Sequence, residues 1–130
     1  MVSKPKTVLI IEDEPDAADL FAEMMRVSGF RVLKTTRSAP AIAMMKTEQP
    51  DVVILDIMMP ETSGLDILRE MRVTPGLEEI PAVVVSAKSM PADIKSGMEA
   101  GASTYLTKPV GFQELKEAVE RALGISKGKS

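Results

Sequence analysis

Three short, unbroken runs of apolar and mostly β-branched residues dominate the pattern along the chain. They are residues 8–11 (VLII), 52–55 (VVIL) and 82–85 (AVVV). This composition is typical of parallel strands that helices cover on both faces of a sheet, because both sides of each strand are then buried. Residues 31–35 and 103–106 are weaker strand candidates, and their greater polarity suits the two edges of the sheet.

Five amphipathic segments alternate with these runs and have the spacing of helices. The first begins at Pro15, which suits a first helical turn, and ends at Gly29. The others open at Ser38 with Pro40, carry Leu65, Leu68 and Met71, run from Pro91 to Gly101, and follow a stripe from Leu115 to Ala122. Five such strand–helix units, joined by right-handed crossovers, predict one α/β domain with a parallel sheet between two layers of helices.

Polar residues that could take part in binding or catalysis follow four of the predicted strands. Glu12 and Asp13 come after the first strand, Asp56 after the third, Ser86 after the fourth and Lys108 after the last. Each alone has an ordinary explanation as a helix cap, a turn residue or a solvated charge. Ligands of open parallel sheets bind outside the carboxyl ends of the strands, however, so the joint placement predicts a site at that edge.

Composition narrows the chemistry of this site. The 130 residues include no His and no Cys, which excludes disulfides, thiolate zinc sites and a phosphohistidine within the chain. The net charge of −3 and the absence of a basic block argue against direct binding of nucleic acid. No apolar run approaches the ~20 residues of a membrane span, so we expect a cytoplasmic protein without membrane contact. Carboxylates, hydroxyls and lysines must therefore carry any chemistry.

The acidic residues of the predicted site indicate a metal. Glu12, Asp13 and Asp56 would crowd like charges together, and such a cluster either raises a pKa or holds a cation. An all-oxygen ligand set favours Mg²⁺ or Mn²⁺. Beside such an ion Asp56 can attack phosphorus to form an aspartyl phosphate, while Lys108 and Ser86 bind phosphoryl oxygens on the other side.

Four motifs in fixed order resemble the receiver domain of two-component response regulators. They are Glu12-Asp13, Asp56-Ile57-Met58-Met59-Pro60 with Gly64, Ser86-Ala87, and Tyr105-Leu106-Thr107-Lys108-Pro109. The resemblance covers residues 6–124 and leaves 1–5 and 125–130 as polar tails. It implies a flavodoxin-like three-layer sandwich whose five parallel strands have the order 2-1-3-4-5. One receiver uses nearly the whole length, so we expect no output domain in this chain.

The resemblance also implies roles for the acidic residues. Asp56 would be the phosphoacceptor, and Asp13 and Asp56 would ligate Mg²⁺ directly. Glu12 would act mostly through water, and the Met58 backbone carbonyl would supply a further ligand.

A second group of roles concerns the phosphoryl group and the response to it. Ser86 and Lys108 would contact the phosphoryl group, Ala87 would be small enough to admit it, and the Lys108–Pro109 peptide would be cis, which spacing alone leaves open. Tyr105 matches the family's switch aromatic. Its ring would move inward when the phosphate draws in Ser86, changing the face made by the fourth helix, fifth strand and fifth helix.

Several residues depart from the commonest family pattern. Ser63 stands where Asp is frequent, which should alter a turn cap and leave the chemistry intact. Ser86 replaces the more frequent Thr, and the lost methyl group should weaken coupling to Tyr105. Met58 and Lys88 flank the pocket mouth, where they would screen the acyl phosphate from water, so we expect slow-to-moderate autodephosphorylation.

The resemblance implies protein partners. We expect a sensor histidine kinase or phosphotransfer protein as donor and a downstream effector protein as target. The chain itself would be a monomer or a weak phosphorylation-dependent dimer, and it would catalyse only its own phosphorylation and dephosphorylation. A phosphorelay shuttle, or the receiver module of a longer regulator or hybrid kinase, would have the same sequence features.

Other functions fit less well. An aspartate-nucleophile phosphatase needs a second Asp two residues after the nucleophile, where this chain has Met58. A flavin or nucleotide carrier needs a glycine- or hydroxyl-rich loop after the first strand, where residues 12–15 are EDEP. A degenerate receiver would lack some of the chemical positions, all of which are filled in this chain.

Overall fold

The structure is a computed structural model and describes residues 4–125. Strands and helices alternate along it as β1 (Thr7–Ile11), α1 (Pro15–Val27), β2 (Arg31–Thr35), α2 (Ala41–Glu48), β3 (Val52–Leu55), α3 (Gly64–Val73), β4 (Ala82–Ser86), α4 (Pro91–Ala100), β5 (Thr104–Thr107) and α5 (Phe112–Ala122). The strand and helix predictions are confirmed, with small shifts at the ends. The predicted tails, 1–5 and 125–130, lie largely outside the described residues.

The five strands form one parallel sheet in the order β2-β1-β3-β4-β5. This is the predicted order, and the two polar strands β2 and β5 occupy the edges as expected. Every residue of β1, β3 and β4 is buried, because these strands are covered on both faces.

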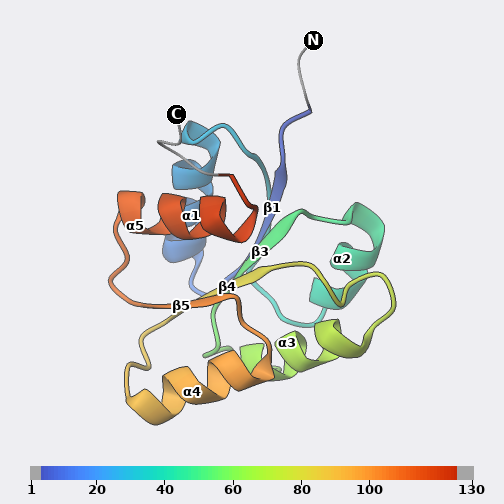
Figure 1. Cartoon of the computed structure of the whole chain (residues 1–130), viewed down its shortest axis with the longest axis vertical. Helices are drawn as coiled ribbons and strands as arrows, with labels where there is room; N and C mark the ends of the chain where they lie inside the picture. Colours follow the sequence, from blue (N-terminus) through green and yellow to red (C-terminus); the bar gives the residue numbers. More distant parts are fainter. Residues whose placement is uncertain (1–3, 126–130) are drawn as a thin grey trace.

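The helices form two layers, with α1 and α5 on one face of the sheet and α2, α3 and α4 on the other (Figure 1). Alternate residues of each strand enter the two cores. Val8 and Ile10 of β1 pack with the α1 and α5 side, whereas Leu9 and Ile11 pack with the opposite side. The predicted three-layer sandwich is therefore confirmed, and within the described residues no helix is long and apolar enough to cross a membrane.

The start of α2 differs from the prediction. The helix begins at Ala41, and its N-cap residue Pro40 offers no side-chain hydrogen bond. The Ser38 hydroxyl instead accepts a hydrogen bond from the Thr62 N–H at 3.0 Å and contacts the Glu61 carboxylate at 3.4 Å. Ser38 therefore joins the loop after β2 to the loop after β3.

One arginine fixes the C-terminal end of α4. The Arg72 guanidinium, at the end of α3, donates Nε and Nη2 to the Gly101 carbonyl at 3.1 and 2.8 Å. Its Nη1 donates to the Ile80 carbonyl at 2.8 Å. The turn between α4 and β5 is thereby tied both to α3 and to the segment before β4.

Candidate functional site

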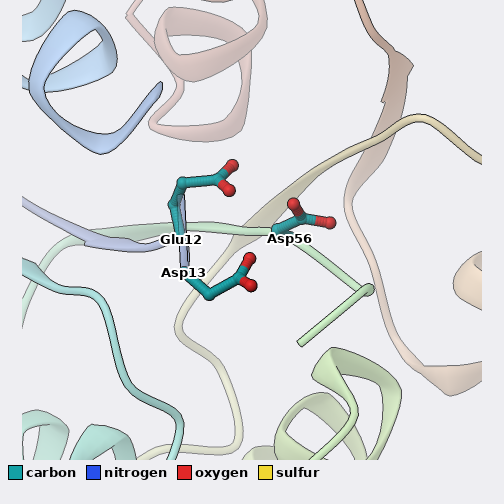
Figure 2. Close-up of side chains that lie close together, drawn as sticks. All are labelled: Glu12, Asp13 and Asp56. Atoms are coloured by element: carbon teal, nitrogen blue, oxygen red, sulfur yellow. The ribbon is translucent and has the colours of Figure 1, made fainter. Parts of the chain in front are cut away.

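Three acidic residues meet at the carboxyl end of the sheet. Glu12 and Asp13 follow β1 and Asp56 follows β3, and these strands pair in register up to Ile11 and Leu55. Each of the three acidic residues has a carboxylate oxygen within 4.8 Å of the others. Figure 2 shows the three carboxyl groups gathered in one place. The predicted acidic cluster is present.

Lys108 pairs with both of the buried members of this cluster. Glu12 and Asp56 are 1% and 5% exposed. The Lys108 Nζ lies 2.9 Å from Glu12 Oε1 and 3.0 Å from Asp56 Oδ2. Because a buried carboxylate without a partner is strongly unfavourable, this ammonium group stabilises both.

Backbone N–H groups bind the remaining carboxylate oxygens. The Met58 N–H donates to Asp56 Oδ1 at 2.9 Å, and the Glu14 N–H donates to Glu12 Oε2 at 3.2 Å. Both oxygens of each buried carboxylate therefore have a partner. The Asp56 carboxylate is held from two directions, by the loop after β3 and by the residue after β5.

Burial and proximity shift the pKa values at this site. Burial raises the pKa of Glu12, against the opposing effect of the hydrogen bond from Lys108. Burial alone would lower the pKa of Lys108, but its hydrogen bonds to Glu12 and Asp56 outweigh that effect and raise it. The lysine therefore stays charged, while the crowded carboxylates gain from any additional positive charge.

The geometry around Lys108 agrees with the predicted backbone. The Lys108–Pro109 peptide is cis. The Lys108 N–H donates to the Ser86 carbonyl at 2.9 Å, so the residue after β5 is joined to the end of β4. This joins the lysine and the serine of the predicted site at the same edge of the sheet.

Ser86 and Tyr105 contact the same residue, Lys88. The buried Ser86 hydroxyl oxygen accepts the Lys88 N–H at 3.1 Å, and the Tyr105 hydroxyl donates to the Lys88 carbonyl at 2.7 Å. Burial raises the pKa of Tyr105, the nearby Ser86 hydroxyl opposes this, and the Asp93 and Asp56 carboxylates add to it. The sequence placed Lys88 only at the pocket mouth, because a contact through backbone atoms leaves no pattern in residue types.

A cleft of about 550 Å³ opens beside the acidic cluster. It is lined by Asp13, Ile57, Met58, Met59, Pro60, Ser63, Leu65 and Lys88. Met58 is 48% exposed. Met58 and Lys88 therefore flank the mouth of the pocket, as predicted, while their screening of an acyl phosphate stays a prediction.

Gly64 allows the loop after Asp56 to close on itself. Its N–H donates to the Ile57 carbonyl at 2.9 Å, and a Cβ atom at position 64 would lie 2.2 Å from the Asp56 carbonyl oxygen. No residue with a side chain fits without moving that backbone. The neighbouring Ser63 hydroxyl accepts the Leu65 N–H at 3.1 Å and caps α3, which confirms its predicted role in a cap.

A second, apolar groove begins at the same edge and follows α1. About 390 Å³ in volume, it is lined by Ala17, Leu20, Phe21, Lys108, Pro109 and Val110. A further depression continues from Leu20 along Met24 and Val27 to Phe112. Leu20 and Val27 are 54% and 68% exposed, so this face of α1 presents apolar side chains to solvent next to Lys108.

Comparison with known proteins agrees with this geometry. Residues 8–120 match the family described as the response regulator receiver domain. The chain is 32% identical over 116 residues to protein PilH of Pseudomonas aeruginosa, covering 89% of this chain and 96% of PilH. It is 29% identical over 120 residues to the polar-differentiation response regulator DivK of Brucella anthropi, covering 92% of this chain and 98% of DivK.

A solved structure is similar in fold and holds a metal. The receiver domain of the sensor histidine kinase PA1611 from Pseudomonas aeruginosa has a magnesium ion coordinated in its active-site cleft. Its TM-score to this chain is 0.86 at 25% sequence identity, and the match covers 93% of this chain and 99% of that one.

Proposed function

The chain belongs to the response regulator receiver domains of two-component signalling, and from that premise we propose that Asp56 accepts a phosphoryl group in a Mg²⁺-dependent reaction. One observation carries the proposal: the buried Asp56 carboxylate lies against Lys108 Nζ at 3.0 Å and beside the carboxylates of Glu12 and Asp13. The proposed acceptor, the cation that would bind phosphoryl oxygens and the proposed metal ligands thus share one edge of the sheet.

The proposed step is a displacement at phosphorus. A carboxylate oxygen of Asp56 attacks the phosphorus atom of a partner's phosphohistidine or of acetyl phosphate. The new O–P bond forms while the P–N or P–O bond of the donor breaks, and the leaving imidazole or acetate keeps the electron pair. Because these 130 residues include no His, a histidine donor must lie outside them.

Two side chains, Lys108 and Ser86, would stabilise the transferred group. Lys108 would exchange its contact with the free Asp56 carboxylate for contacts with phosphoryl oxygens, where developing negative charge is greatest. The Ser86 oxygen accepts the Lys88 N–H, and its hydroxyl proton would be donated to a phosphoryl oxygen.

The acidic residues fit a divalent cation because all their ligand atoms are carboxylate oxygens. Asp13 and Asp56 would hold the ion directly, Glu12 would do so through water, and the Met58 carbonyl would be a further ligand. When bound, Mg²⁺ supplies positive charge that offsets the repulsion between Asp56 and an anionic donor. Mn²⁺ has the same ligand preferences.

Tyr105 is proposed as the residue through which phosphorylation changes the surface. A phosphoryl group that pulls the Ser86 hydroxyl toward itself would also disturb Lys88, because the Ser86 oxygen accepts the Lys88 N–H. The Lys88 carbonyl in turn accepts the hydrogen bond from the Tyr105 hydroxyl. Tyr105→Ala should therefore leave phosphoryl uptake intact and reduce the difference in effector binding between the two forms. An equal loss of uptake and discrimination would contradict this role.

The partners we propose are a phosphohistidine protein as donor and an effector protein as target. The exposed apolar groove along α1 starts at Lys108 and Pro109, so a donor protein seated on it would bring its histidine to the edge where Asp56 lies. The chain would work in the cytoplasm, either as a switch or as a phosphorelay shuttle. It would act as a monomer or weak dimer and catalyse only its own phosphorylation and dephosphorylation.

Intact mass measurement tests the proposed reaction. The chain is incubated with acetyl phosphate and Mg²⁺, with Asp56→Asn and a chelator-treated sample as controls. We expect one phosphoryl adduct on the wild-type chain and none in either control. An adduct of equal yield on Asp56→Asn, or none on the wild-type chain, would overturn the proposal.

A further inference from the structure

Tyr105 packs its ring against a glycine in the C-terminal half of α4. Gly97 is buried and lies three residues before the end of this helix. A Cβ atom at position 97 would lie 2.7 Å from Tyr105 Cδ2 and 2.9 Å from Cε2. Those distances are shorter than any ordinary contact between carbon atoms, so the ring occupies space that only glycine leaves free.

The backbone of α4 does not explain this glycine. Gly97 is not among the residues with positive φ. Glycine inside a helix is unfavourable relative to alanine, because it loses more conformational freedom on folding. The space given to the Tyr105 ring offsets that disadvantage.

α4 has little freedom to retreat from the ring. Two Arg72 nitrogens bind the Gly101 carbonyl, and a third nitrogen binds the Ile80 carbonyl. The Gly101 and Ala102 N–H groups donate back into the last turn of the helix. A side chain at position 97 would therefore displace the Tyr105 ring more readily than it would displace the helix.

A displaced ring would lose its hydrogen bond as well. The Tyr105 ring lies over Gly97, a position that we call the docked ring, and in that position its hydroxyl donates to the Lys88 carbonyl. Lys88 is also the residue whose N–H the Ser86 hydroxyl accepts. The docked ring is therefore joined to the proposed phosphorylation site through one residue.

We propose that Gly97 is the positioning residue of the switch: by leaving the ring its place on α4, it keeps the docked ring populated before any phosphoryl group is bound. Phosphorylation would then stabilise a ring position that already exists, as a population shift. The inference rests on the proposed function for its consequence in signalling. The steric role of Gly97 stands separately and is tested separately.

A single chromophore makes the test direct. Tyr105 is the only tyrosine and the chain has no tryptophan, so phenol absorbance and tyrosine fluorescence report this ring alone. Gly97→Ala is compared with Ser96→Ala, a change at the exposed neighbouring position of the same helix. In wild type and Ser96→Ala, the phenol should titrate above the ordinary pKa of 10.0 because the ring is partly buried.

In Gly97→Ala we expect the titration midpoint to fall toward 10.0 and acrylamide to quench the fluorescence more strongly, because the ring is displaced into solvent. A midpoint and quenching equal to those of Ser96→Ala would overturn the proposal.

A thermal double-mutant cycle keeps the test valid if Gly97→Ala folds poorly. In the Tyr105→Ala background the ring is absent, so Gly97→Ala should raise the melting temperature, as alanine does in an unobstructed helix. In the wild-type background the same change should raise it less or lower it. Equal effects in both backgrounds, or failure of the double variant to fold, would show that the ring is not what position 97 accommodates.

Acetyl phosphate separates this inference from the proposed function. Wild type and Gly97→Ala should take up the phosphoryl group equally, because position 97 lies outside the acidic cluster. No adduct on either chain would contradict the proposed function and leave the titration result intact. Loss of the adduct in Gly97→Ala alone would contradict a role for Gly97 that is confined to the ring.

Discussion

The acidic cluster and the Tyr105 ring lie at the same end of the sheet but are held very differently. Glu12 and Asp56 are almost fully buried, and both oxygens of each carboxylate are bonded. Tyr105 is partly exposed and forms one hydrogen bond, to the Lys88 carbonyl. The proposed phosphorylation site thus has one arrangement, whereas the proposed switch residue is held by a contact that is easily exchanged.

Burial explains this difference. Moving a charge out of water is so unfavourable that few arrangements of its partners are stable, which orders the cluster. A phenol ring at the surface exchanges one hydrogen bond for a bond to water at little cost, so two positions can lie within a few kcal/mol of each other. A switch needs a loosely held group, such as this ring, beside a rigidly held one, such as the acidic cluster.

We expect the strongest effect of a substitution at the acidic cluster, on the rate of phosphoryl uptake. Lys108→Met removes the cation that we propose to bind phosphoryl oxygens, so uptake from acetyl phosphate should slow by about 10²-fold or more. Mg²⁺ should bind more tightly, because the competing ammonium at 2.9 and 3.0 Å from the two carboxylates is gone. Mass kinetics and calorimetry measure the two effects, with the exposed Lys95→Met as control. Unchanged uptake would remove Lys108 from the mechanism.

The apolar groove next to Lys108 should matter only for a protein donor. Leu20→Asp places a charge in the groove and should slow transfer from a phosphorylated histidine kinase by about tenfold, a typical loss at an interface residue. Uptake from acetyl phosphate should not change. The kinase is found by phosphotransfer profiling, and Val73→Asp, on the exposed side of α3, is the control. Equal slowing with both donors would show that Leu20→Asp acts on the acidic cluster and that the groove is not a docking surface for the donor.

A smaller change is expected at the mouth of the cleft. Met58→Asn replaces an apolar side chain, which we expect to screen the acyl phosphate, with an amide that can hold a water molecule, so the phosphoryl group should be lost a few times faster. The decay of the adduct after removal of acetyl phosphate gives the rate, and Met98→Asn on α4 is the control. If the lifetime is unchanged, Met58 does not screen the site.

The smallest effect concerns the loosely held ring. Burial raises the pKa of Tyr105 above 10.0, so the unfolded chain loses this proton at lower pH than the folded chain. The contribution of Tyr105 to stability is therefore full below pH 10 and decreases as the pH rises through the folded pKa. We expect a change below about 1 kcal/mol, because solvent screens a partly exposed group. Denaturant titrations on both sides of pH 10 measure it, and Tyr105→Phe should remove it.

The sequence predicted the ordered parts better than the loosely held ones. Runs such as VVIL reveal buried strands because burial on both faces leaves only apolar residues. Glu12, Asp56 and Lys108 were identified because parallel strands bring their carboxyl ends together. The cis peptide before Pro109 did not follow from spacing and was expected only from the family resemblance.

Contacts through backbone atoms or missing side chains could not be predicted. Lys88 joins Ser86 to Tyr105 through its N–H and carbonyl, which every residue except proline possesses. Gly97 acts through the absence of a Cβ atom, and its neighbour in space is eight positions away in another element. Ser38 was placed at the start of α2, but its hydroxyl bonds across to Thr62. Each of these depends on the packing of distant elements, which local patterns do not encode.

Chemical mapping of the phosphorylated residue tests whether Asp56 is the acceptor. The chain is phosphorylated with acetyl phosphate and Mg²⁺ and treated with sodium borohydride, which reduces an acyl phosphate to the alcohol. Digestion with trypsin then yields residues 47–69, which contain Asp51, Asp56 and Asp66. If Asp56 is the acceptor, reduction to homoserine occurs at position 56 alone. Reduction at either of the other two aspartates, or at Asp13 in a different peptide, with Asp56 intact, would contradict it.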